Sequence, residues 1–302
     1  MRTYTEKVAP GTYRLETYIS GIMNTIFSVY FLKDKSPVII EPGPAAVIPA
    51  VQKALADLAL NNPGYIIPTH IHLDHSGGLG DLMQIFPQAK AVLNQQGAKH
   101  LIDPSRLIAS TKMAFGEDFE NVYGKITPVP QSRIQIVRDN DSLSTGNRNL
   151  VFINTPGHAP HHIAIFDTTT KGLFCGEALG LIYKPGAPPL PATAPPSFDP
   201  DLYISNMVRL RELKPKLLFY SHGGVGNEPE KLIDAAIENT KLFGDAVLRA
   251  VKLKMTEEAV IQNIGEYVID RFGFKLDEYE LGSNVRAHLH YFRKIGIGEL
   301  PQ

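Results

Sequence analysis

Three histidines and one aspartate lie within six consecutive positions of this 302-residue chain. They are His70, His72, Asp74 and His75 in the stretch THIHLDHSGG, whereas the whole chain has only 10 histidines. Imidazole and carboxylate groups are the side chains that bind first-row divalent metals in proteins. Because such dense packing of these side chains has no evident structural purpose, the stretch predicts a metal site.

The spacing of these residues indicates how they would reach a metal. His70 and His72 are two positions apart, and side chains at that spacing point to the same side of an extended segment. A strand that ends here would therefore deliver two imidazoles to one cation. Asp74 and His75 follow where we expect the chain to turn into a helix, so they can reach a second point nearby.

Further candidate ligands follow at the ends of three expected strands. They are His158 in TPGHAPHH, Glu177 in LFCGEALG and His222 in FYSHGG. Each lies beside glycine or proline, as expected for a loop that bends over a ligand. We expect His162, close to His158, to support the site by hydrogen bonding rather than by binding metal.

The elements that must position these residues alternate between strand and helix over the first 225 residues. Short β-branched and aromatic runs, such as residues 11–19 and 26–32, predict strands. Residues 45–60 predict an amphipathic helix, and residues 65–70 a buried strand that leads into the histidine cluster. Residues 161–179 predict a hairpin, so the pattern indicates an α/β fold with mixed sheets.

The character of the chain changes in its last third. Residues 183–200 contain seven prolines, which excludes a helix or a central strand there. Helical patterns then replace strands near 229–253, 256–272 and 283–294. We expect one domain over residues 1–228 and a helical subdomain over residues 229–302. We also expect the proline-rich loop and the helical tail to form the walls of a substrate pocket.

Composition limits the classes of function. Lys and Arg number 30 against 31 Asp and Glu, so no basic balance suggests a nucleic-acid partner. The single cysteine, Cys175, excludes an intrachain disulfide and a multi-cysteine zinc finger. No apolar run has membrane-spanning length, and no signal-peptide pattern is visible. We expect a soluble, cytoplasmic protein with a small-molecule substrate and no membrane partner, for which a homodimer is possible.

The motifs together resemble the metallo-β-lactamase superfamily of metal-dependent hydrolases. THIHLDHSGG, TPGHAPHH, LFCGEAL and FYSHGG occur in the order and approximate spacing of that family, and SPVIIEPGPA and NTIFSVYFL are similar to its N-terminal strands. The resemblance spans residues from about 8 to 228. It implies an αββα four-layer sandwich with a dinuclear metal site at one edge, followed here by a C-terminal helical appendage.

The resemblance also implies a role for each candidate ligand. The family pattern has two ligand sets and a bridging carboxylate: His70, His72 and His158; Asp74, His75 and His222; and Glu177 as the bridge. The family normally has Asp at the bridging position and Asp-x-Gly where this chain has Glu41-Pro42-Gly43. We expect Glu41 to support the metal-binding loop and the longer Glu177 to bind metal. The extra length of Glu177 requires either that the Gly176 backbone is set back from the metals or that the carboxylate binds one metal only and the two metals are further apart.

Such a site predicts a metal-dependent hydrolase. Two cations about 3.5–4 Å apart can hold a hydroxide between them at neutral pH, which would cleave a small-molecule ester, thioester or lactone. Asp74 would orient the hydroxide and could pass a proton to the leaving group. Tyr183, Tyr220 and His288 are candidates for substrate contact, and plain packing is the alternative for each.

Two other interpretations stay open. An iron-dependent redox protein of the same fold, such as a sulfur dioxygenase or a diiron oxygen-binding protein, uses similar ligands, although a flavodiiron protein would have Glu where His72 stands. A metal-bound ligand sensor with little turnover is the other. Because histidine and carboxylate suit several metals, we expect two divalent ions per chain, with zinc or iron favoured and manganese possible.

Overall fold

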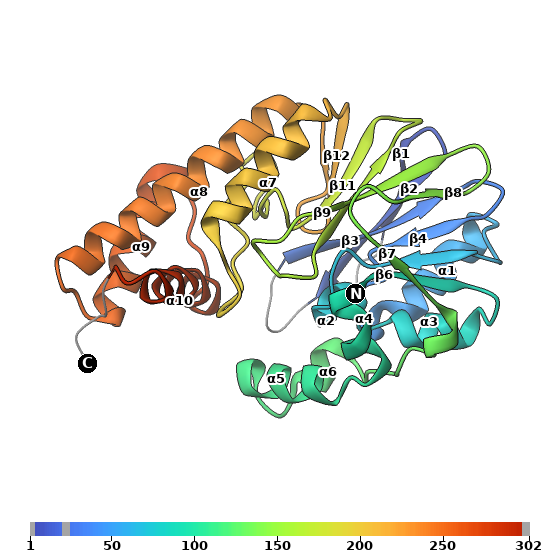
Figure 1. The fold of residues 1–302 in the computed structure, drawn as a ribbon, viewed down its shortest axis with the longest axis horizontal. Helices are drawn as coiled ribbons and strands as arrows, with labels where there is room; N and C mark the ends of the chain where they lie inside the picture. Colours follow the sequence, from blue (N-terminus) through green and yellow to red (C-terminus); the bar gives the residue numbers. More distant parts are fainter. Residues whose placement is uncertain (1–3, 20–24, 298–302) are drawn as a thin grey trace. The chain divides into compact units, whose positions relative to one another are not determined.

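The computed structural model describes residues 4–19 and 25–297, which fall into two compact units (Figure 1). The described residues of the first unit lie within Met1–Asn154, His161–Gly176 and Pro215–Asn227. Those of the second lie within Thr155–Pro160, Glu177–Lys214 and Glu228–Gln302. The last break coincides with the boundary predicted near residue 228, and the existence of a separate domain over residues 229–302 stays a prediction.

The first unit contains two mixed sheets, the larger of which has seven strands in chain order from β1 to β7. Neighbours are antiparallel from β1 to β4 and parallel from β4 to β7. The strands are β1 (Tyr4–Ala9), β2 (Thr12–Ile19), β3 (Thr25–Leu32), β4 (Val38–Ile40), β5 (Tyr65–Ile67), β6 (Lys90–Asn94) and β7 (Ile134–Val137). Strand β5, in the parallel half of this sheet, leads directly into the histidine cluster.

The smaller sheet has six strands in the order β13-β12-β11-β10-β9-β8. Only β11 and β12 are parallel to one another. The strands are β8 (Ser142–Ser144), β9 (Asn149–Asn154), β10 (Ile163–Asp167), β11 (Gly172–Gly176), β12 (Leu217–Tyr220) and β13 (Val225–Gly226). Tyr30 and Ile40 of the larger sheet share one buried apolar cluster with Phe152 and Phe174 of this sheet, so the two sheets pack face to face.

Helices of the first unit cover the other face of the larger sheet. They are α1 (Ile48–Asp57), α2 (Leu73–Ser76), α3 (Leu79–Ile85), α4 (Gln95–Ile102), α5 (Ser105–Phe115) and α6 (Phe119–Tyr123), with single 3₁₀ turns at Ala45–Val47 and Gln131–Arg133. Val51 of α1 and Leu82 of α3 join Phe31 and Ile66 of the sheet in a second buried cluster. Burial of these apolar stripes holds the helices in place.

The second unit is built from α7 (Pro200–Glu212), α8 (Pro229–Lys252), α9 (Glu257–Phe272) and α10 (Glu278–Lys294). Thr256, the first residue of the helical pattern expected near 256–272, caps α9, because its hydroxyl accepts the Ala259 N–H at 3.3 Å. The last helix begins five residues before the expected start. Asp277 explains the difference, since its carboxylate accepts the Glu280 N–H at 2.8 Å and caps the helix there.

The proline-rich loop consists of turns and one isolated bridge, as its prolines predicted. Leu190 joins the apolar core of α8–α10, and the Pro189 carbonyl accepts the Asn239 side-chain N–H at 2.9 Å. Two mixed sheets with flanking helices and the C-terminal helices α8–α10 confirm the predicted fold class. Within residues 4–19 and 25–297, none of the helices combines the length and apolar character that a membrane crossing requires.

Candidate metal centre

The histidine cluster lies in the turn from β5 to α2. His72 is the N-cap residue of α2, and its backbone is extended rather than helical. Asp74 and His75 lie inside this short helix, where the sequence predicted that the chain would turn. The turn therefore separates the cluster into a part before the helix and a part within it.

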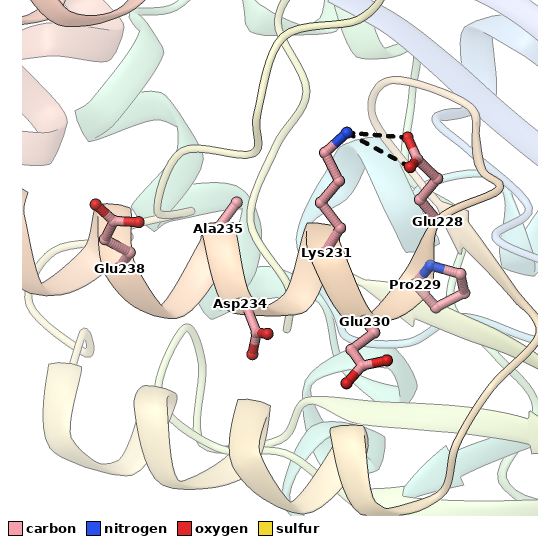
Figure 2. Close-up of a pocket in the computed structure, with 7 residues that line it drawn as sticks. All are labelled: Glu228, Pro229, Glu230, Lys231, Asp234, Ala235 and Glu238. Carbon is pink, nitrogen blue, oxygen red and sulfur yellow. Dashed lines mark hydrogen bonds and ion pairs between the residues drawn. The ribbon is translucent and has the colours of Figure 1, made fainter.

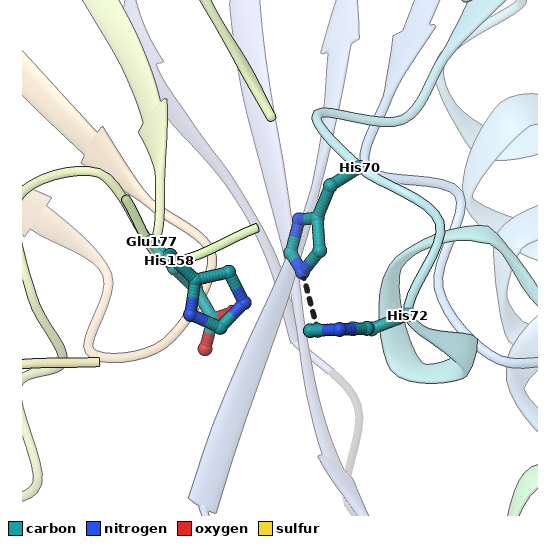
Figure 3. A group of neighbouring side chains, drawn as sticks. All are labelled: His70, His72, His158 and Glu177. Carbon is teal, nitrogen blue, oxygen red and sulfur yellow. Dashed lines mark hydrogen bonds and ion pairs between the residues drawn. The ribbon is translucent and has the colours of Figure 1, made fainter. Parts of the chain in front are cut away.

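The structure gathers the seven predicted ligands into two groups. Within each group, one candidate ligand atom per residue lies within 4.8 Å of the others. The groups are His70, His72, His158 and Glu177 (Figure 3), and Asp74, His75 and His222. All are buried except His72, which is half-buried. Buried clusters of imidazole and carboxylate have the donor chemistry that divalent first-row metals require.

Close approaches define the first group. His70 Nε2 lies 2.9 Å from His72 Nδ1 (Figure 3), and His158 Nε2 lies 2.8 Å from Glu177 Oε2. The other ring nitrogens of two histidines have protein partners. His158 Nδ1 donates to the Ala192 carbonyl at 3.1 Å, and His70 Nδ1 lies 3.0 Å from the Thr69 hydroxyl. Partners of this kind orient a histidine so that Nε2 is left for a metal.

Asp74 is at the centre of the second group. Its Oδ2 lies 3.2 Å from His75 Nε2 and 3.2 Å from His222 Nε2. Burial by itself would raise the pKa of Asp74, but His75 and His222 hold that pKa far below its usual range. Burial would lower the pKa of His75, but Asp74 and Glu41 raise it well above the ordinary value. The carboxylates of Asp74 and Glu41 thus stabilise positive charge at this group. A bound divalent cation would supply such a charge.

Glu41 contacts both His75 and the loop before the histidine cluster, and its expected role in supporting that loop stays a prediction. Its Oε1 accepts the Thr69 backbone N–H at 2.7 Å, and its Oε2 contacts His75 Nδ1. The carboxylate therefore ties β4 to the ligand loop and leaves His75 Nε2 directed at Asp74. The residue is 1 % exposed and has a positive φ of 58°, a conformation that non-glycine residues seldom adopt.

Two neighbouring histidines flank the ring of His70. The ring centre of His162, predicted to support the site, lies 5.0 Å from that of His70, and His162 is fully buried. His161 stacks on His70 at 6.2 Å and lies 6.1 Å edge-on from His72. The half-buried ring of His161 therefore lies beside two of the candidate ligand rings.

The three predicted substrate contacts occupy different surroundings. The hydroxyl of Tyr183 donates to the Glu280 carboxylate at 2.9 Å, and Tyr220 is fully buried in β12. His288 is also fully buried, and its Nδ1 donates to the Asn284 carbonyl at 3.0 Å. Neither Tyr220 nor His288 offers accessible surface in this structure. Their contact with a substrate stays a prediction.

A shallow pocket of about 680 Å³ lies along the first turns of α8 (Figure 2). Its lining residues are Glu228, Pro229, Glu230, Lys231, Asp234, Ala235 and Glu238, so it contains none of the candidate ligands. Three of its carboxylates pair with cations: Glu228 with Lys231, Asp234 with Arg211, and Glu238 with Arg271.

The family model of the metallo-β-lactamase superfamily matches residues 25–222, which include all seven candidate ligands. The chain belongs to the metallo-β-lactamase superfamily. This membership confirms the resemblance that the four motifs indicated.

Two relatives and one solved structure illustrate the range of the similarity. The metallo-β-lactamase fold-containing protein ST1585 of Sulfurisphaera tokodaii is 31% identical over 206 residues, 66% of this chain and 74% of the relative. A hydroxyacylglutathione hydrolase of Yersinia pestis is 30% identical over 149 residues, so the match spans 49% of this chain and 44% of that enzyme. The metallo-β-lactamase family protein TTHA1429 of Thermus thermophilus shares the fold, with a TM-score of 0.70 at 20% identity over 96% of this chain and 95% of that protein.

Proposed function

We propose that this metallo-β-lactamase superfamily protein is a metal-dependent hydrolase of a small-molecule ester, thioester or lactone. The observation that carries the proposal is that this superfamily member has two groups of buried donor side chains. Four of the seven candidate ligands come from one six-residue stretch. The similarity to hydroxyacylglutathione hydrolase supports this reaction class, since hydroxyacylglutathione is a thioester. Fold by itself would not select a substrate.

Each donor group would hold one cation. The first would use His70, His72, His158 and Glu177, and the second Asp74, His75 and His222. Two divalent cations bound there would polarise the attacked oxygen and activate water at neutral pH. The carboxylates of Asp74 and Glu177 would neutralise part of the positive charge, which neutral imidazoles cannot do.

Residues of the chain would then handle the water and its proton. The ionised carboxylate of Asp74 can only accept hydrogen bonds, so it would orient the attacking water. After attack, the same carboxylate could carry the proton to the leaving group. Burial of the donor groups strengthens such electrostatic interactions because little water screens them.

Metal analysis together with hydrolysis assays tests the proposal. The natively purified protein should contain two divalent ions per chain and should hydrolyse a member of a panel of lactones, thioesters and simple esters. Its electronic spectrum separates the metals, because a diiron site absorbs visible light and a dizinc site does not. Absence of bound metal, or two metals without turnover of any panel member, would contradict the proposed hydrolase.

A further inference from the structure

Tyr203, the fourth residue of α7, has a fully buried side chain whose hydroxyl is central to a small polar network. The hydroxyl donates to the backbone carbonyl of Glu177 at 2.5 Å. It also accepts the backbone N–H groups of Gly180 at 2.9 Å and Ala192 at 3.3 Å. One phenol therefore joins the backbone of a candidate ligand to two other points in the following chain.

The network extends from Tyr203 to a second candidate ligand. Ala192 donates its N–H to the Tyr203 hydroxyl, and its carbonyl accepts Nδ1–H of His158 at 3.1 Å. His158 Nε2 in turn lies 2.8 Å from the carboxylate of Glu177. Tyr203 is thus connected to both Glu177 and His158, through the carbonyl of Glu177 and through Ala192, the orienting partner of His158.

The rest of α7 holds the loop that carries His158. The Asp199 N–H donates to the Gly157 carbonyl at 2.8 Å, and the Asn206 side chain donates to the Pro156 carbonyl at 2.7 Å. Gly157 has a φ of +133°, and a Cβ there would lie 2.6 Å from the Cα of Tyr203. The loop therefore lies directly against the helix, and any shift of Tyr203 would reach it.

We propose that Tyr203 is a positioning residue that sets the metal affinity of the group formed by His70, His72, His158 and Glu177. This inference rests on the proposed function, because it requires that the group binds a metal. Removal of the hydroxyl would leave the Ala192 N–H without this partner. It would also leave the Glu177 carbonyl and the Gly180 N–H with only their mutual hydrogen bond at 3.2 Å, so both ligands would lose part of the network that fixes their geometry. The group of Asp74, His75 and His222 relies on Glu41 instead, and its affinity should stay unchanged.

The test compares wild type with Tyr203→Phe, which removes only the hydroxyl. Metal-free protein is titrated with Zn²⁺ against a chromophoric chelator, and Co²⁺ absorption follows the coordination of each ion. His72→Ala and His222→Ala identify which dissociation constant belongs to which group. Tyr203→Phe should weaken the first group's Zn²⁺ affinity by about 10–100-fold, as loss of orienting partners does at other metal sites, and should leave the second constant at its wild-type value.

Tyr267→Phe is the matched control, since its hydroxyl is buried and has no hydrogen-bond partner among the described residues. Both of its constants should equal those of wild type. Asn206→Ala gives a second variant if Tyr203→Phe does not fold. It should weaken the Zn²⁺ affinity of the first group as well, by a smaller factor than Tyr203→Phe.

Three outcomes separate this inference from the proposal on which it rests. Unchanged constants in the folded Tyr203→Phe, or in Asn206→Ala where Tyr203→Phe does not fold, would overturn the positioning role. An equal loss of Zn²⁺ affinity at both groups would also overturn the positioning role, because it would indicate a general loss of structure. A wild-type protein that binds fewer than two Zn²⁺ ions would overturn the proposed function instead.

Discussion

Glu177 Oε2 lies 2.8 Å from His158 Nε2, although the two residues belong to loops that follow different strands. Both residues are buried, with 4 % of Glu177 and 3 % of His158 exposed. The carboxylate belongs to the donor group of His70, His72 and His158. That the longer side chain of Glu177 binds one metal only stays a prediction.

Replacement of Glu177 tests that arrangement. Glu177→Ala should lose one metal equivalent, because the first donor group would keep only neutral imidazoles. Glu177→Asp should retain two metals, since it restores the carboxylate at the length usual for this family. Elemental analysis of both purified variants gives the metal content directly. Two tightly bound metals in Glu177→Ala would show that this carboxylate is not a ligand.

His72→Ala should remove the metal of the first group and abolish turnover. The variant lacks one of three imidazoles in that group, and a catalytic pair of metals cannot form with a single ion. Metal content and hydrolysis rate are measured on the same preparation. His290→Ala, which changes an exposed histidine of α10, is the control and should behave as wild type. Full metal occupancy with normal turnover in His72→Ala would remove the basis for the assignment.

Glu41→Gln should weaken metal binding at the second group by about 10–100-fold, the usual effect of losing an orienting partner. The amide oxygen can still accept the Thr69 N–H, but the negative charge beside His75 Nδ1 is lost. Competition with a chelator measures the affinity. Glu280→Gln, which alters another buried carboxylate, serves as the control. Equal affinity in Glu41→Gln and wild type would mean that the contact does not tune the metal.

His288 should make folding sensitive to acid. The ring lies near Phe198, Phe243 and Phe292, and burial lowers its pKa to about 4, although donation to the Asn284 carbonyl opposes this. The folded-state pKa is thus below the ordinary value of 6.5, so the unfolded chain binds the proton first as the pH falls. The contribution of neutral, buried His288 to the free energy of unfolding is fully present above pH 6.5. As the pH falls to 4, the free energy of unfolding decreases by about 3 kcal/mol because of this residue.

Denaturant unfolding of chelator-treated protein at several pH values measures this loss. His288→Leu cannot bind a proton and should show a shallower decline of the unfolding free energy between pH 6.5 and 4. His290→Gln removes an exposed histidine and should decline as wild type does. Parallel pH curves for wild type and His288→Leu would mean that His288 does not contribute.

Local features of this protein were readable from the sequence. The two-residue spacing of His70 and His72, the strand before them and the helix after them follow from nearest-neighbour geometry. The hairpin of β10 and β11 and the Thr256 cap are local in the same sense. The start of α10 was predicted five residues too late, because the prediction rested on the spacing of apolar residues. The helix begins instead after Asp277, whose side chain caps it.

Only the tertiary structure shows which residues contact and orient the candidate ligands. Tyr203 lies in α7, where a tyrosine ordinarily indicates packing, and no local pattern connects it to the carbonyl of Glu177, 26 positions earlier. The contact of His158 with Ala192 spans 34 positions. Glu41 was expected to support the loop, but its contact with His75 required β4 and β5 to pair. Such partners depend on the paths of loops between elements, and local conformational preferences do not determine those paths.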